Sequence, residues 1–352
     1  MKLSDIGERG WINKVRARSP AIKEGVVLGI GDDTAWLKGL ESLLVTCDLL
    51  IDQVHFIKDM IPPRLLGRKS LSVNLSDISA MAGVPDYALV GVGFPKEIKL
   101  DYVDELLEGF LEVAVEHKVD IIGGDTTASP MLSIAVTIIG HPAKEKPVLR
   151  STAQPKDKIW LTGTVGDASL GFEILKKAQS EELDISDLHH SSLILKHFDP
   201  KPRIEAGIRL AEIARAMIDV SDGVMLDLEH IIEESGKKSP LRAVIYLDKI
   251  PLSQDFKKYF HNEPLQKEEA IQLILSGGED YELLFTAPEE FREEINKISA
   301  ELDLPITEIG EIQPAEKNEV VIIAPDGSPY PAPKPWFEHF PAKENLKDEP
   351  GS

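Results

Sequence analysis

The sequence has 352 residues and a single cysteine, Cys47, so it cannot form a disulfide within one chain. It has no signal peptide and no apolar run near the roughly 20 residues that a membrane-spanning helix requires. Aromatic residues make up only 6% of the chain, which predicts an aliphatic core. These shortages exclude a disulfide-stabilised secreted domain and an integral membrane protein, and they predict a cytoplasmic protein.

Positive charge is also scarce. The chain has 39 lysines and arginines against 60 aspartates and glutamates, and its formal net charge is −21. Such a chain repels nucleic-acid backbones and anionic membranes, so we expect neither as a partner. Walker A, complete G-x-G-x-x-G, kinase H-R-D and H-E-x-x-H sequences are absent too. Any nucleotide must therefore be bound by a less common arrangement.

The chain instead repeats one local pattern, in which an apolar run ends in glycine, aspartate and hydroxyl residues. The central example is residues 119–127, with the sequence VDIIGGDTT. Glycines let the backbone approach a ligand closely, an aspartate there can bind a hard cation, and successive N–H groups can hold a phosphate. The same pattern recurs in five other segments, at residues 29–34, 46–48, 74–77, 219–223 and 276–280.

Each of these segments alone has an ordinary explanation, because aspartate is common in turns and at helix N-termini. Asp77 could simply face solvent, Arg150 could be a solvated linker charge, and His55 could be a satisfied surface histidine. Converging carboxylates, however, repel one another unless they are protonated or bridged by cations. Six such segments therefore favour one shared site with divalent metal over six unrelated turns.

Apolar periodicity predicts an alternation of strands and helices in both halves of the chain. In the first half, helices at 64–81 and 101–117 separate short apolar strands, and residues 121–127 form a turn. A proline- and lysine-rich stretch with little apolar content then predicts a linker. We expect an α/β fold with an N-terminal domain at 1–140, a linker at 141–157, a C-terminal domain at 158–340 and a disordered tail at 341–352.

Taken together, these motifs resemble the thiamine-monophosphate kinase family, which belongs to the aminoimidazole ribonucleotide synthetase superfamily. The resemblance spans nearly the whole chain, and its motifs are jointly specific although each is weak. It implies a two-domain α/β fold whose N-terminal domain binds ATP and Mg²⁺ and forms a homodimer through its sheets. The motifs are residues 29–33, 46–48, 55–56, 73–77, 123–127, Arg150, residues 219–223, residues 276–281 and the aromatic cluster 336–340.

The resemblance also implies an activity, the ATP-dependent phosphorylation of thiamine monophosphate to thiamine diphosphate with several Mg²⁺ ions. It assigns ATP binding to Gly124, Asp125, Arg150 and Ser221. It assigns the thiamine substrate to His55, Glu279 and Phe337. The metal ligands that it implies are Asp33, Thr46, Cys47, Asp48, Asp77, Asp125, Asp219 and Asp222.

Two positions depart from the family pattern. Cys47 stands where the family usually has serine or threonine, and a thiol is a poor ligand for Mg²⁺. Either its backbone carbonyl makes that contact, or the ion has one ligand fewer. Lys156 stands where the family usually has glycine, which alters the linker turn more than the chemistry.

The acceptor in this reaction is a phosphate that is already ionised at neutral pH, so we expect no catalytic general base. Asp77 and Asp125 would be essential through the metal. Two alternatives stay open: another ATP-using enzyme of the same superfamily, or a non-catalytic protein that binds nucleotide or thiamine phosphate. Turnover to ADP distinguishes an enzyme from the latter.

Overall fold

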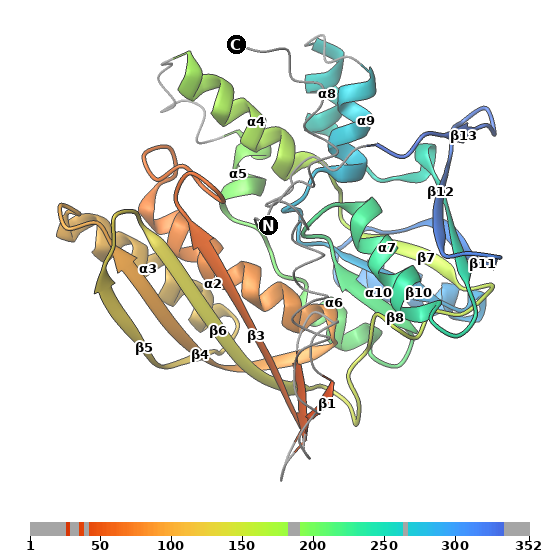
Figure 1. Cartoon of the computed structure of the whole chain (residues 1–352), viewed down its shortest axis with the longest axis horizontal. Coiled ribbons are helices and arrows are strands. Elements are labelled where there is room, and N and C mark those ends of the chain that lie inside the picture. The colour runs from red at the N-terminus through yellow and green to blue at the C-terminus, as the bar shows by residue number, and fades with distance from the viewer. Residues whose placement is uncertain (1–25, 29–34, 39–41, 182–190, 263–266, 334–352) are drawn as a thin grey trace, which may run out of the picture.

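The computed structural model describes residues 26–28, 35–38, 42–181, 191–262 and 267–333. These ranges form two β-sheets with helices packed around them (Figure 1). Three features singled out in the sequence, Asp33, the aromatic cluster 336–340 with Phe337, and the tail at 341–352, lie outside the described residues.

The first sheet has six strands in the order β1-β2-β3-β6-β4-β5. Its neighbours are antiparallel except for β4 and β5, which run parallel because helix α3 (Leu100–Glu116) crosses between them. The strands are β1 (Val26–Leu28), β2 (Ala35–Lys38), β3 (Ser42–Ile51), β4 (Gly83–Phe94), β5 (Asp120–Ala128) and β6 (Ser133–Pro142).

Helices α2 (Pro63–Ala80) and α3 cover one face of this sheet (Figure 1). Successive side chains of a strand point to opposite faces, and β3 shows this alternation clearly. Leu44, Thr46 and Leu50 are buried toward the helices, whereas Cys47 and Leu49 are exposed on the other side. Neighbouring residues of this strand therefore serve two different surfaces.

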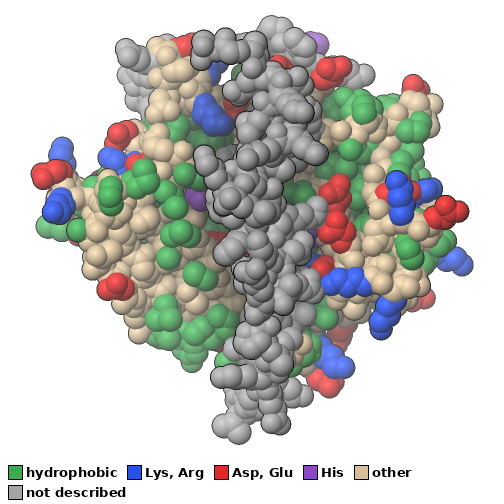
Figure 2. Space-filling view, viewed as in Figure 1, with side chains coloured by type: hydrophobic (Ala, Val, Ile, Leu, Met, Phe, Trp, Pro, Cys, Tyr) green, Lys and Arg blue, Asp and Glu red, His purple; other side chains and the backbone are tan. Residues whose placement is uncertain are grey.

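The face of the first sheet turned away from α2 and α3, called the outer face below, carries exposed apolar side chains. Leu49 is 50% exposed and Tyr87 44%, and Leu89 and Cys47 are exposed beside them. Figure 2 shows hydrophobic side chains gathered over this sheet with few charged ones among them. An apolar patch of this kind commonly marks an interaction surface.

The second sheet has seven strands in the order β13-β12-β9-β11-β7-β10-β8. The strands are β7 (Lys158–Thr162), β8 (Ala216–Asp219), β9 (Leu241–Tyr246), β10 (Leu283–Ala287), β11 (Ile306–Pro314), β12 (Glu319–Ile323) and β13 (Pro329–Tyr330). The helices around it are α4 (Asp167–Ser180), α5 (Ser192–Phe198), α6 (Ile204–Leu210), α7 (Val224–Ser235), α8 (Gln254–Asn262), α9 (Lys267–Ser276) and α10 (Arg292–Glu301), with short 3₁₀ turns at Leu247–Lys249 and Glu289–Phe291.

Helix α2 joins the half of the molecule built on the first sheet to the half built on the second sheet, because it packs on α5, α6 and β8 as well as on the first sheet. Its C-terminal end, at Ala80, belongs to an apolar cluster that also contains Trp160 and Phe285 of the second sheet. Burial of this shared cluster holds the halves in one arrangement. The predicted domain division at 141–157 stays a prediction.

The structure corrects the predicted turn at 121–127. Strand β5 continues through Gly123, Gly124 and Asp125 to Ala128, paired in parallel with β4, and it is exposed along its whole length. The sequence suggested a turn because glycines and aspartate are uncommon within strands. Here the pairing with β4 supplies the hydrogen bonds that keep an edge strand extended. Strand β2 and helix α8 were not predicted at all.

Candidate active site

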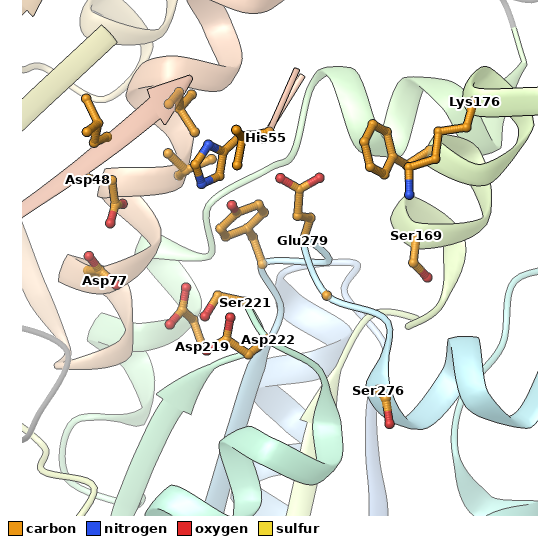
Figure 3. Close-up of a pocket in the computed structure, with 17 residues that line it drawn as sticks. Asp48, His55, Asp77, Ser169, Lys176, Asp219, Ser221, Asp222, Ser276 and Glu279 are labelled. Carbon is orange, nitrogen blue, oxygen red and sulfur yellow. The ribbon is translucent and has the colours of Figure 1, made fainter. Parts of the chain in front are cut away.

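A pocket of about 320 Å³ lies between the two halves, a size within the usual range for small-ligand sites (Figure 3). Five parts of the chain converge on it: the end of β3 with the loop that follows it, helix α2, helix α4 and two loops of the second half. The lining residues that carry chemistry are Asp48, His55, Asp77, Ser169, Lys176, Asp219, Ser221, Asp222, Ser276 and Glu279.

One end of the pocket is acidic, because Asp48, Asp77, Asp219 and Asp222 all line it (Figure 3). Asp48 comes from β3, Asp77 from α2, and Asp219 ends β8. Segments that are distant in sequence thus bring four carboxylates to one place. We call these four residues the acidic cluster.

The polar residues of α2, unusual in so apolar a helix, hold this cluster in position. The side-chain carbonyl of Asn74 accepts a hydrogen bond from the Asp48 backbone N–H at 2.8 Å. Ser76 donates its hydroxyl to Asp219 Oδ2 at 2.6 Å, and both Asn74 and Ser76 are buried. The Thr46 hydroxyl donates to Asp77 Oδ2. One turn of α2 therefore positions carboxylates from both halves.

The electrostatics of the cluster favour a cation. The pKa of Asp48 is raised to about 6, mainly by burial and in addition by the nearby charges of Asp219 and Asp222. Burial likewise raises the pKa of Asp219 to about 6, although Ser76 and the positive charge of Arg150 oppose that rise. A buried carboxylate that ionises poorly by itself gains most from a positively charged partner.

The donor set fits a hard divalent cation, because carboxylate oxygens are the ligands that Mg²⁺ prefers. Within the described ranges, however, no three His, Cys, Asp or Glu side chains are grouped closely enough to hold one ion as they stand. Asp33, which the resemblance adds to this set, lies outside those ranges. The chemistry of the cluster therefore matches a metal, while the side chains remain spread apart.

The loop between β8 and α7 lies against the loop that follows α9. The N-cap of α7 is Gly223, with φ +108°. A Cβ on Gly278 would lie 2.1 Å from the Ser221 carbonyl oxygen, so only glycine permits this approach. Glu279 N–H then donates to that same oxygen at 2.8 Å. The close packing brings Ser221 and Glu279 to one wall of the pocket.

Glu279, Phe172 and Lys176 also line the pocket, with Lys176 on the side away from the acidic cluster (Figure 3) and its Nζ 4.4 Å from the centre of the Phe172 ring. Burial alone would raise the pKa of Glu279, but Lys69 and His197 beside it lower it to about 2. This carboxylate is therefore ionised at every physiological pH. His55 lines the same cavity, and its Nδ1 accepts a hydrogen bond from the Ile51 backbone at 3.1 Å.

The structure brings together seven of the residues singled out in the sequence, and it places others elsewhere. Asp48, Asp77, Asp219, Asp222, Ser221, His55 and Glu279 line the pocket. Thr46 contacts Asp77, and Arg150 acts electrostatically on Asp219. Asp33 and Phe337 lie outside the described residues.

Gly124 and Asp125 do not reach this pocket within one chain. The register pairs Asp48 with Val136, Val136 with Val90, and Val90 with Gly124, so β5 is three strand spacings, about 14 Å, from β3. Asp125 shares its row with Leu49, which lies on the outer face. By the same alternation the Cys47 side chain points away from Thr46 and Asp48.

Sequence reasoning missed Lys69, His197, Phe172 and Lys176. Lys69 carried a detectable signal, because it lies on the apolar stripe of α2 between Leu66 and Val73. A lysine on such a stripe requires a buried partner. The other three gave no local signal, since only tertiary packing brings them to the pocket.

Residues 31–141 match the family model described as AIR synthase related protein, N-terminal domain. The fold and the acidic pocket thus place the chain in the AIR synthase-like class. It is 33% identical over 341 residues to the thiamine-monophosphate kinase of Aquifex aeolicus (strain VF5), covering 97% of this chain and 100% of that one. Identity to the Escherichia coli (strain K12) enzyme of the same name is 34%, covering 95% and 98%. The chain therefore belongs to the thiamine-monophosphate kinase family.

Solved structures agree with this assignment. AaThiL complexed with AMPPCP and TMP matches with a TM-score of 0.80 and 32% identity, covering 97% of this chain and 99% of that one. The hydrogenase maturation protein HypE in complex with ATP matches with a TM-score of 0.63 at 18% identity, which shows a shared fold alone. The family and the α/β fold that the motifs predicted are confirmed.

Proposed function

We propose that this chain transfers the γ-phosphoryl group of ATP directly to thiamine monophosphate, yielding ADP and thiamine diphosphate. A terminal oxygen of the acceptor phosphate forms the new bond to the γ-phosphorus as the bond to the β–γ bridging oxygen breaks. The observation that carries the proposal is the pocket that sets an acidic cluster opposite Glu279, in a chain similar over its whole length to thiamine-monophosphate kinases. No proton has to be removed from the ionised acceptor, so no general base is needed.

The acidic cluster would hold Mg²⁺, and this ion would neutralise charge on the transferring phosphates. Two observations support the metal: the raised pKa of buried Asp48 and Asp219, and an all-oxygen donor set. The proposed ligands are Asp33, Thr46, Cys47 through its backbone, Asp48, Asp77, Asp125, Asp219 and Asp222.

The nucleotide and the thiamine substrate would occupy different ends of the pocket. Arg150 and Ser221 would bind the ATP phosphates beside the acidic cluster, and Gly124 and Asp125 would join them there from a second copy of the chain. His55, Glu279 and Phe337 would contact thiamine monophosphate. The ionised Glu279 is suited to accept hydrogen bonds from an amino-substituted ring, and it is also suited to lie near a cationic one.

The enzyme would work as a homodimer formed through the outer face of the first sheet. Leu49, Tyr87 and Leu89 expose apolar surface there, and a second copy would cover it. The position of Asp125 gives independent support, because it lies on this face and away from its own acidic cluster. Its proposed role would then be carried out at the interface between two copies.

We also place the enzyme in the cytoplasm, without nucleic-acid or membrane partners. The net charge of −21 and the single cysteine support this placement. Among the described helices none is long and apolar enough to cross a membrane.

The decisive experiment measures ADP release from ATP with thiamine monophosphate, with and without Mg²⁺. Free thiamine serves as the control acceptor, and the product is identified by chromatography. Mg²⁺-dependent ADP release with thiamine diphosphate as product is the expected outcome. ATP binding without turnover would instead favour another substrate of the superfamily or a sensor.

A further inference from the structure

A lysine is completely buried between the two halves, beside the pocket. Lys69 of α2 is 0% exposed, and its Nζ lies 3.1 Å from Glu279 Oε2 and 3.0 Å from the carbonyl oxygen of His197. His197, at the end of α5, is 1% exposed. Three elements that are distant in sequence thus meet at one charged contact. A fully buried lysine is costly unless it is paired, so this contact needs an explanation.

The hydrogen positions in this contact follow from its geometry. His197 Nδ1 lies 2.6 Å from Glu279 Oε2, which places the proton on Nδ1 and makes the carboxylate its acceptor. The 3.3 Å approach of Lys69 Nζ to Nδ1 is then not a hydrogen bond, because both atoms are donors. Lys69 donates to Oε2 and to the His197 carbonyl instead. Both donors converge on Oε2 and neither contacts Oε1, which leaves Oε1 as the oxygen available to the cavity that Glu279 lines.

The backbone of Glu279 is itself held in an unusual conformation. Its φ is +65° and that of Tyr281 is +51°, a region that side chains other than glycine rarely adopt. Hydrogen bonds from Glu279 N to Ser221 O and from Tyr281 N to Val220 O stabilise this loop. The loop presents Glu279 toward Lys69, and an extended backbone would carry the carboxylate elsewhere.

We infer that Lys69 and His197 are positioning residues for substrate recognition: they anchor Oε2 of Glu279 so that Oε1 binds the ring end of thiamine monophosphate. This inference rests on the proposed function and adds two residues to it. Neither side chain touches the substrate, since both lie behind Glu279 and are buried. The burial of Lys69 and His197 also keeps competing water away from the anchored oxygen.

Because Lys69 belongs to the first half and Glu279 to the second, the ring end of the site is complete only when the halves are packed together. Burial lowers the pKa of Lys69, and burial together with Lys69 lowers that of His197, whereas the charge of Glu279 opposes both effects.

The test compares steady-state kinetics of the full-length enzyme carrying Lys69→Met, His197→Leu or His197→Asn. Lys69→Met keeps the apolar stem and removes the charge. His197→Leu removes the Nδ1 donor, whereas an asparagine amide can occupy the Nδ1 position and restore it. We expect the first two variants to raise KM for thiamine monophosphate at least about tenfold, with KM for ATP changed less than about twofold. His197→Asn should restore most of the affinity for thiamine monophosphate that His197→Leu loses, so its KM should lie close to the wild-type value.

Arg203→Gln is the matched control. Arg203 Nε donates to buried Glu282 at 2.7 Å, three residues beyond Glu279, and neither residue lines the pocket. Its loss should lower the thermal midpoint without a selective effect on thiamine monophosphate.

The inference would be overturned if Lys69→Met and Arg203→Gln each changed KM for thiamine monophosphate and KM for ATP equally, in proportion to the loss of thermal midpoint. The proposed function would then remain intact. If Lys69→Met does not fold, the comparison of His197→Leu with His197→Asn tests the inference. Indistinguishable kinetics of these two variants would overturn the inference. A wild-type enzyme that does not phosphorylate thiamine monophosphate would overturn the proposed function and this inference with it.

Discussion

Replacing Asp219 by asparagine should stabilise the metal-free protein while abolishing its activity. The pKa of Asp219 is about 6 in the folded state and 3.8 in an ordinary environment. That difference, at about 1.36 kcal/mol per pKa unit, amounts to about 3 kcal/mol. Asparagine keeps an acceptor for the Ser76 hydroxyl and removes the buried charge. We therefore expect Asp219→Asn to raise the free energy of unfolding by about 2–3 kcal/mol at pH 7.5 in EDTA.

The sign of the pH dependence follows from the direction of the pKa change. The folded protein binds this proton more tightly than the unfolded chain does, so the wild-type protein is most stable, with respect to Asp219, below about pH 4. The stability that protonated Asp219 contributes falls as the pH rises toward 6 and is lost above that pH. The advantage of Asp219→Asn should therefore be large at pH 7.5 and small at pH 4.5. Asp48 behaves in the same way, and because the charge of Asp219 contributes to its raised pKa, the effects of the two residues do not simply add.

The assay is urea unfolding followed by circular dichroism at both pH values, in EDTA and in Mg²⁺. Mg²⁺ should stabilise the wild-type protein at pH 7.5 and have much less effect on the variant. Asp248→Asn is the control, because this aspartate is exposed in the second half and its loss should change stability by less than about 0.5 kcal/mol. The reasoning is refuted if Asp219→Asn is less stable than the wild type at pH 7.5 in EDTA.

Three further predictions concern the metal and the interface. Asp77→Ala and Asp125→Ala should each lower kcat at least about 100-fold with unchanged circular dichroism, since they remove charge stabilisation and not core packing; near-normal turnover in either would contradict the metal assignment. Leu49→Asp should convert a dimer into monomers in light-scattering measurements, whereas Leu107→Asp, on the exposed side of α3, should not. Maleimide labelling of the exposed Cys47 should slow as protein concentration rises, and a concentration-independent rate would argue against burial of the outer face.

The convergence of Asp48, Asp77, Asp219 and Asp222 on one pocket could be predicted from the sequence because their signals are local, whereas their role as metal ligands stays a prediction. Asp48 and Asp219 each end an apolar run, and an aspartate at a strand end is visible without knowledge of the fold. The polar residues Asn74, Ser76 and Asp77 were equally visible as exceptions within an apolar helix. Their partners were not, since Ser76 and Asp219 are 143 positions apart. Which polar groups pair across such distances is decided by the packing of the two halves.

The side of a strand on which a residue lies was also beyond sequence reasoning. Residues 46–48 form a single motif, yet strand geometry places the side chains of Thr46 and Asp48 on the side of the acidic cluster and that of Cys47 on the outer face. In β5 the same alternation places Gly124 and Asp125 on opposite faces of the sheet. A motif treated as one unit therefore contributes to two different surfaces. The glycine-rich stretch 123–127 gave the further error of a predicted turn, because its strand is stabilised by pairing with β4.

Helix α2 is the element on which the two ends of the site depend. Asn74, Ser76 and Asp77 organise the acidic cluster, and Lys69 anchors Glu279 two turns earlier. At about 1.5 Å of rise per residue, Lys69 and Asp77 are about 12 Å apart along the helix axis. A rigid helix thus sets the separation between the carboxylates proposed for the phosphates and the carboxylate proposed for the ring. Since α2 also packs on both halves, any shift between them changes both ends of the site at once.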